Sequence, residues 1–398
     1  MAKRRVRRKQ NTLAKIGTSI ARGKGDRALL LVVFGMILFG SLMVFSGSVP
    51  IAAVQERAPY YYFIKHIQFI VIGLILFGIT YNVDYHLYPK IIVPALFFTV
   101  FLLIIVLFMP PIQGSHRWLD LKFTTIQVSD IAKLTLTLYL ASWLSKPIVK
   151  NARSSEMRHY LIYNLAPFLL ILGFFSFLII LEPNLSTTLL IGLISLSIYY
   201  ISGNDRLHTI GTGGIFITLS ILGLIAGLTA SYRFQRVRTF MSFLVSGELQ
   251  EPFGRDYQLR QILIAVGTGK FFGAGFSQSK QKFSYLTETA LSDSIFAIFA
   301  EEFGFIGSVV LVSIYVWIMF RGFKIAANAP DKLGSLIASG ITIWITLQAF
   351  IHFSVNVGLI PLTGMPLPFI SYGGSSLVTL MIAIGILLNI SRYSDSYE

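Results

Sequence analysis

Long apolar runs separated by short polar stretches make up most of this chain of 398 residues. A run of about 20 apolar residues is long enough to cross roughly 30 Å of hydrocarbon as a helix. The pattern predicts about ten such helices and leaves no segment long enough for a separate soluble domain. The predicted spans are residues 28–47, 61–82, 91–110, 128–145, 160–181, 187–202, 208–230, 293–320, 334–356 and 372–391.

We therefore predict an all-α polytopic membrane protein with one membrane domain at residues 28–392. Between the seventh and eighth spans, residues 231–292 are predicted to form a long structured extracytoplasmic loop. Within it, residues 257–266 carry apolar side chains at helical spacing opposite polar ones, which favours an interfacial or re-entrant helix. The following glycine-rich stretch resembles a phosphate-binding loop by spacing. No strand precedes it, so tight turns are the better interpretation.

Composition and charge agree with a membrane location. Hydrophobic residues make up 54% of the chain and charged residues 13%, with a mean hydropathy of +0.70, whereas soluble domains carry about a quarter charged residues. Lys and Arg gather in the tail 1–27 and in the loops 146–158 and 321–332. By the positive-inside rule this places both tails, 1–27 and 393–398, in the cytoplasm. Attraction to anionic lipid explains the basic tail better than nucleic-acid binding does.

Asp293 stands where the long outer segment meets the eighth predicted span. An acid at this level is partly removed from water, which raises the pKa of a carboxyl group toward the working range of a general base. Ser292 or Asp293 could instead cap the N-terminus of the helix that follows. The two interpretations are compatible, and both remain open on spacing alone. The chain has no Cys, so thiol chemistry is excluded.

Cations on the outer side are unusual for a membrane protein. Arg233 and Arg236 follow the seventh span, and Arg117 lies beside Trp118 in the outer segment 111–127. Guanidinium groups bind phosphate oxygens in pairs, so a lipid diphosphate would account for them. Pairing with nearby acids or with lipid phosphate is the alternative.

Asp130 and Lys133 lie three residues apart inside the fourth span, so they share a helical face and are expected to pair. In an apolar stretch Lys133 should point into the bundle. The pair is either a structural contact or part of a substrate or metal site. Lys65, His66, Gln348, His352, Glu301 and Glu302 are weaker candidates of the same kind.

The outer segment 361–376 holds several Pro and Gly residues, which are incompatible with a regular helix. Irregular backbone at membrane depth is tolerated only against protein or a water-filled cavity. We interpret the segment as a rigid cavity wall, with a simple turn as the alternative.

This segment, from Asn356 to Ser375, resembles the signature of the SEDS family of shape, elongation, division and sporulation proteins (FtsW, RodA, SpoVE). Tyr257-Gln258 and Gly273-Ala274-Gly275 fit that family's outer loop, and ten spans is the family's number. Four further motifs similar to those of the family follow in the expected order: Gly114–Trp118, Gln127–Leu134, Glu182–Leu185 and Asp293–Gly304.

The resemblance implies a peptidoglycan glycosyltransferase that polymerises lipid II at the outer face of the bacterial cytoplasmic membrane. Asp293 maps onto the family's essential acid and would act as the general base. A class B penicillin-binding protein is the implied partner, with other division proteins beside it. The implied substrate-binding residues are Arg117, Trp118, Lys133, Arg233, Arg236, Gln258, Ser371 and Tyr372. The implied supporting residues are Asp130, Glu288, Glu301, Pro366, Pro368, Gly373 and Gly374.

No cofactor is implied with certainty, although a divalent cation, Mg²⁺ or Mn²⁺, is compatible with this family. The sequence shows no dedicated metal site. A lipid II flippase or a non-enzymatic division scaffold would share much of the same pattern. The polar residues cluster on the outer side, which favours an enzyme over a flippase. Residues 279–283 resemble the division branch, FtsW, more than the elongation branch.

The chain departs from the family pattern in places. The Pro and His that precede the family's acid are missing, and the stretch from Tyr285 to Asp293 is about one residue longer. These differences leave the path of the loop before the acid open. Asn184 stands where the family has Asp, and Ser186 where it has Gly. Asp130 replaces a Glu, and the shorter side chain is expected to weaken its pairing with Lys133.

Overall fold

A computed structural model describes residues 23, 25–111, 115–120, 125–146, 161–203, 208–218, 238, 240–243, 257–287 and 289–393. Apart from one two-stranded hairpin, its regular elements are helices. The first half contains α2 (Arg27–Val54), α3 (Tyr61–Asn82), η1 (Tyr85–Leu87), α4 (Tyr88–Leu107), β1 (Trp118–Asp120), β2 (Thr125–Gln127), α5 (Val128–Leu144), η2 (Leu161–Leu165), α7 (Ala166–Leu181) and α8 (Leu185–Ser202). The second half contains α11 (Tyr257–Thr268), α12 (Gln281–Ser284), α13 (Ile295–Ala327), α14 (Lys332–Asn356) and α15 (Gly374–Ser391).

Eight of the described helices are long and apolar enough to cross a membrane. Each coincides with a predicted span, which confirms the polytopic helical fold. The fourth predicted span is α5, whose 17 residues are nearly all buried by other helices. The seventh is helical over residues 208–218, and its remainder lies outside the described residues. The first and eighth spans were predicted too short, because α2 and α13 continue to Val54 and Ala327.

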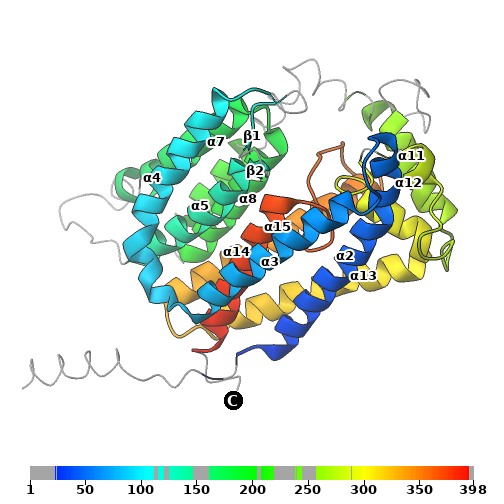
Figure 1. The fold of residues 1–398 in the computed structure, drawn as a ribbon. Coiled ribbons are helices and arrows are strands. Elements are labelled where there is room, and N and C mark those ends of the chain that lie inside the picture. Colours follow the sequence, from blue (N-terminus) through cyan, green and yellow to red (C-terminus); the bar gives the residue numbers. More distant parts are fainter. Residues whose placement is uncertain are drawn as a thin grey trace, which may run out of the picture.

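The helices form two groups around a shared centre (Figure 1). Helices α4, α5, α7 and α8 pack against one another on one side, and α2, α3, α11 and α13 lie on the other. Helix α14 contacts α5, α8, α13 and α15, so it joins the two groups and is buried along most of its length. Helix α15 packs between α3 and α5. The buried core therefore centres on the last two spans.

Helix α3 packs closely on α15 and leaves most of its surface open. Of its 22 residues only His66 and Gly73 are buried. A Cβ on Gly73 would lie 2.3 Å from the sulfur of Met381, and one on Gly385 would lie 2.2 Å from Thr80 Oγ1. A Cβ at either position would force the facing side chain to shift, so glycine at both positions allows the close packing of the two helices.

Helix α13 is broken at Gly304, whose backbone has a φ of 68° and a ψ of −166°. The amides of Phe305 and Ile306 do not continue the helix and donate instead to the carbonyls of Lys270 and Phe271. The carbonyls of residues 301 and 302 accept from the amides of residues 274 and 275 in the same turn. The turn at residues 269–276 therefore supplies the partners that the broken helix lacks, as buried backbone requires.

Candidate active site

Asp293 lies in the short irregular stretch before α13 and is half-buried. The three consecutive backbone carbonyls of residues 291–293 are all held by side chains or amides from distant elements. The bonds are Tyr372 N to Leu291 O at 2.8 Å, Ser371 Oγ to Ser292 O at 3.0 Å, and Asn356 Nδ2 to Asp293 O at 3.1 Å. The N-cap position of α13 is Ser294, one residue beyond Asp293, and it makes no side-chain capping bond.

The carboxylate of Asp293 lies against the irregular segment 361–373. Gly364 in that segment has a φ of 70°, and a Cβ placed on it would lie 3.3 Å from Asp293 Oδ2. The segment is held from α8, where Ser186 Oγ donates to Thr363 O at 2.8 Å. The prediction that this stretch cannot be helical is confirmed, and the helix begins only at Gly374, with Gly373 at its N-cap position.

Three side chains on one face of α14 fix the same region. Gln348, His352 and Asn356 are spaced four residues apart, which places them one above another on a helix. Gln348 Nε2 donates to Pro366 O at 2.9 Å. His352 Nδ1 lies 2.7 Å from Met365 O, and it must donate because a carbonyl only accepts. With Asn356 bound to the carbonyl of Asp293, this face of α14 sets the position of both the acid and the wall opposite it.

Asp130 and Lys133 form the predicted ion pair, with 2.8 Å between Oδ1 and Nζ, and both side chains are buried. The expected weakening by the shorter acid is therefore not seen in the geometry. Ser375 Oγ at the start of α15 donates to Asp130 Oδ2 at 2.8 Å. Lys133 Nζ also reaches Gln348 Oε1 at 3.4 Å. Lys133 points into the bundle as predicted, and Gln348 connects it to the wall segment.

Arg117 and Trp118 lie at the hairpin beside this pair. Trp118 in β1 pairs with Gln127 in β2, and the amide of Gln127 donates to Ser375 Oγ at 3.1 Å. The hairpin thus meets the same serine that binds Asp130. Arg117 Nε and Trp118 Nε1 are buried and have no hydrogen-bond partner among the described residues.

Glu182, just beyond the end of α7, is fully buried, and in the described part of the chain neither of its carboxylate oxygens has a hydrogen-bond partner. Burial raises the pKa of Glu182 to about 8, and the nearby Arg117 guanidinium opposes that rise. Asn184, two residues on, caps α8 by accepting from Thr187 N at 3.3 Å. Asn therefore keeps the cap that the family's Asp would supply, without its negative charge.

A buried clamp holds the outer loop on the N-terminal half of α13. Lys282 Nζ lies 2.6 Å from Glu302 Oε1 and donates to Ser46 Oγ in α2 at 2.6 Å. Beside it, Glu301 accepts from the hydroxyl of Ser279 and from two backbone amides at the start of α12. The predicted supporting residue Glu301 thus lies in this clamp, about two turns along the helix from the acid.

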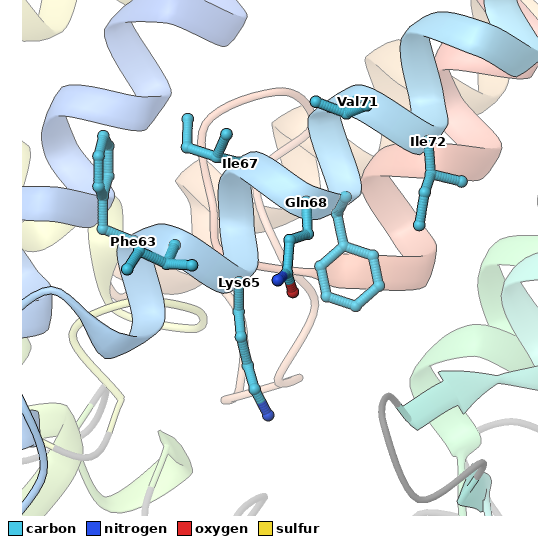
Figure 2. A pocket seen from close by; sticks show the side chains of 8 residues that line it. Phe63, Lys65, Ile67, Gln68, Val71 and Ile72 are labelled. Carbon is cyan, nitrogen blue, oxygen red and sulfur yellow. The ribbon is translucent and has the colours of Figure 1, made fainter.

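An apolar groove of about 700 Å³ runs along α3; we refer to it as the α3 groove. Figure 2 shows the side chains that line it, with Lys65 reaching away from the helix axis into the open space. A Cβ on Gly374 would lie 2.3 Å from the ring of Phe69, so the predicted supporting residue Gly374 makes room for this wall. The lining residues are Phe63, Ile64, Lys65, Ile67, Gln68, Phe69, Val71 and Ile72.

The remaining predicted site residues are placed as follows. Gln258 is in the first turn of α11, which packs on α13 and confirms the predicted helix at 257–266. Pro368 O accepts from the hydroxyl of Tyr315. Arg233, Arg236 and Glu288 lie outside the described residues.

The amides of residues 273–275 bind backbone carbonyls, which confirms the predicted turns in the glycine-rich stretch and leaves no phosphate-binding loop there.

In the sequence, Gln348 and His352 were only weak candidates for the site, and Lys282 was assigned no role in it. The spacing of Gln348, His352 and Asn356 was the available signal for a shared face. Their acceptors are backbone carbonyls, which leave no mark in the sequence. Lys282 pairs with Glu302 20 residues away across a turn, and only the folded path brings them together.

The cell cycle protein family of FtsW, RodA and SpoVE matches residues 26–396. The probable peptidoglycan glycosyltransferase FtsW of Geobacter sp. is 33% identical over 370 residues, which cover 92% of this chain and 96% of that relative. Stage V sporulation protein E of Bacillus subtilis is 36% identical over 374 residues, covering 93% of this chain and 97% of that relative.

Solved structures share the fold. A chain from a peptidoglycan synthase complex that coordinates polymerization and crosslinking aligns with a TM-score of 0.70 at 24% identity, covering 93% of this chain and 98% of that chain. The rod shape determining protein RodA of Thermus thermophilus aligns with a TM-score of 0.65 at 21% identity, covering 94% and 98%. The predicted polytopic architecture is therefore one already known from experiment.

Proposed function

The chain belongs to the FtsW, RodA and SpoVE family, and on that premise we propose that it is a peptidoglycan glycosyltransferase that polymerises lipid II. The observation that carries the proposal is the likeness to the probable peptidoglycan glycosyltransferase FtsW of Geobacter sp. across nearly the whole of both chains. The site supports it, because a half-buried acid faces a rigid wall beside buried cations. Lys and Arg in the tail 1–27 and in the loops 146–158 and 321–332 support a site at the outer face of the cytoplasmic membrane, by the positive-inside rule.

Asp293 is the general base of the proposed reaction. Its carboxylate takes the proton from the 4-hydroxyl of the acceptor sugar as that oxygen attacks the anomeric carbon of the other lipid-linked chain. The new bond joins the acceptor oxygen to the anomeric carbon, and the bond from that carbon to the diphosphate breaks. Undecaprenyl diphosphate leaves with inversion. One base suffices because no covalent sugar intermediate forms, unlike in retaining glycosidases.

The charge that develops on the leaving diphosphate needs cations in a water-poor site. Lys133 and Arg117 are the described candidates, and Arg233 and Arg236 are the candidates outside the described residues. Trp118, Gln258, Ser371 and Tyr372 complete the proposed binding set. The apolar α3 groove offers a surface for a polyprenyl tail, which has no favourable place in water.

Mg²⁺ or Mn²⁺ remains a proposed helper. Among the described residues no group of three or more His, Cys, Asp or Glu side chains could hold a metal ion. We therefore assign no step to a metal. Removal of divalent ions from the assay with a chelator tests this part, and loss of polymer that Mg²⁺ or Mn²⁺ restores would establish a requirement.

The decisive test uses purified protein in lipid nanodiscs with lipid II as substrate. Asp293→Asn is expected to abolish glycan polymer while lipid II binding persists, because only the proton acceptor is lost. Asp120→Asn, at an exposed acid of the hairpin, is the matched control and should polymerise normally. Polymerisation by Asp293→Asn at the wild-type rate would remove the base assignment. Lipid translocation in vesicles without any polymer from wild-type protein would favour a flippase.

A class B penicillin-binding transpeptidase is the proposed partner, since a similar fold occurs in a complex that coordinates polymerization and crosslinking. Cell division is the proposed process, because most of the similar curated relatives bear the name FtsW. Polymer yield with and without the candidate transpeptidase shows whether the chain is active alone. Depletion in cells should produce filaments if it acts in division and rounded cells if it acts in elongation.

A further inference from the structure

The α3 groove is apolar except for Lys65 and Gln68. Both lie in the N-terminal half of α3, which is long and apolar enough to span a membrane. Figure 2 shows Lys65 extending into the groove. A charged side chain in such a position is costly unless it pairs or binds a ligand. The groove thus combines an apolar surface with one cation and one amide, which is the chemistry that an anionic lipid would recognise.

Arg57 stands beside Lys65 at the outer end of α3. Arg57 Cζ lies 4.4 Å and Lys65 Nζ 4.8 Å from the centre of the same Tyr61 ring. None of the ion pairs in the described part of the chain involves either cation. The Tyr61 ring therefore contacts two cations, neither of which forms an ion pair among the described residues, an arrangement that favours a multivalent anion.

This cluster lies next to the stretch that carries Asp293. Tyr62 and His66, which flank Lys65 on α3, contact the ring of Tyr372, with centroids 5.6 Å and 6.1 Å apart. The amide of Tyr372 in turn binds the carbonyl of Leu291, two residues before the acid. A phosphate held by Lys65 would therefore lie in the neighbourhood of the reacting sugars.

We propose that Lys65, with Arg57 beside it and Gln68 as a hydrogen-bond donor, binds the diphosphate of a polyprenyl diphosphate lipid whose tail lies in the α3 groove. This inference rests on the proposed function, in which two lipid-linked chains react. Two diphosphates then need sites. Lys133 lies on α5 and Lys65 on α3, the two helices between which α15 packs.

A polyprenyl diphosphate fits better than a bulk phospholipid on charge. The two cations match a diphosphate, whereas a phospholipid carries one phosphate.

The test measures binding of undecaprenyl diphosphate to the full chain in phosphatidylcholine nanodiscs by native mass spectrometry. Lys65→Gln is expected to weaken binding by roughly tenfold or more, the value of one charged hydrogen bond. Lys65→Arg should retain binding because it keeps the charge. Lys90→Gln, at an exposed lysine at the start of α4, is the matched control and should bind as wild type. Undecaprenol, which lacks phosphate, should bind Lys65→Gln and wild type alike.

Equal affinity of Lys65→Gln and wild type for undecaprenyl diphosphate would overturn the inference, and so would an equal loss for phosphatidylglycerol, which would identify a general anion site. Melting temperatures of all variants show whether they fold, and Lys65→Arg supplies a second reading if Lys65→Gln is unstable. Asp293→Asn separates the two proposals, because it should bind undecaprenyl diphosphate normally. Polymerisation by that variant would end the base assignment without affecting the binding result.

Discussion

Gly364 is the position where a single added methyl group should disturb the carboxylate of Asp293. Its φ of 70° is unfavourable for any residue with a Cβ, and a methyl group there would lie 3.3 Å from Asp293 Oδ2. We expect Gly364→Ala to lower the rate of polymerisation roughly ten- to hundredfold, because small displacements of a reacting group have effects of that size. Initial rates with saturating lipid II measure the effect.

Gly275→Ala is the matched control for Gly364→Ala. It has a φ of 104°, so it carries a comparable backbone strain, and the nearest atom to its Cβ would be Gln278 Cγ at 3.6 Å. Both variants should lose stability by about 1–2 kcal/mol. If both lose activity equally, the effect of Gly364→Ala is one of strain and not of proximity to Asp293.

Glu182 should make the stability of the protein depend on pH. Burial raises the pKa of Glu182 to about 8 in the folded protein, above its value in the unfolded chain. The folded state therefore binds the extra proton, and stability falls as pH rises from about 4.5 to 8. We expect Glu182→Gln to be more stable than wild type near pH 8 and above, by roughly 1–3 kcal/mol.

Melting temperatures in detergent across pH 5 to 9 measure this difference. The gap between Glu182→Gln and wild type should shrink toward the acidic end, where the wild-type carboxyl is protonated as well. A gap that stays constant with pH would show that the carboxyl of Glu182 does not titrate in this window.

Among the contacts between elements, the clamp between α12 and α13 gives the clearest prediction for the free energy of unfolding. Lys282 and Glu302 are both fully buried, so removing one partner leaves an uncompensated charge. Either Lys282→Met or Glu302→Gln alone should cost about 3–5 kcal/mol. The double variant should be more stable than either single one, because no lone charge remains. A double-mutant cycle on thermal unfolding tests this, and strictly additive losses would contradict the pairing.

The elements also show what a sequence can predict and what it cannot. Apolar length located the spans, and spacing predicted the pair Asp130–Lys133 and the helix α11. The break in α13 was not predicted, since Gly304 is one of three glycines in this helix of 33 residues, and the other two, Gly307 and Gly322, keep helical backbone. The residues around the acid bind mainly backbone carbonyls, as Asn356 does. Any residue supplies a carbonyl, so such contacts depend on the fold and not on a readable pair of side chains.

For the whole molecule, the predicted orientation can be tested directly because the chain has no Cys of its own. Ala58→Cys lies exposed in the turn between α2 and α3, and Ala327→Cys lies exposed at the end of α13. A maleimide that cannot cross membranes should label Ala58→Cys in intact spheroplasts and Ala327→Cys only after permeabilisation. The reverse pattern would place the site of Asp293 in the cytoplasm and contradict the proposed lipid II polymerisation.

The break at Gly304 has a mechanical consequence for the molecule as a whole. The break divides α13 into a short segment, residues 295–303, and a longer segment, residues 305–327. Asp293 precedes the short segment. The longer segment exposes Phe305, Ile306 and Val309. The amides of Phe305 and Ile306 donate to the turn at 269–276 and not to the helical segment before the break. The turn at 269–276 accepts from amides beyond the break and donates to carbonyls before it, so together with the covalent backbone at Gly304 it connects the two segments of α13. A shift of the longer segment would therefore be transmitted to the segment that follows Asp293 through this turn as well as along the chain.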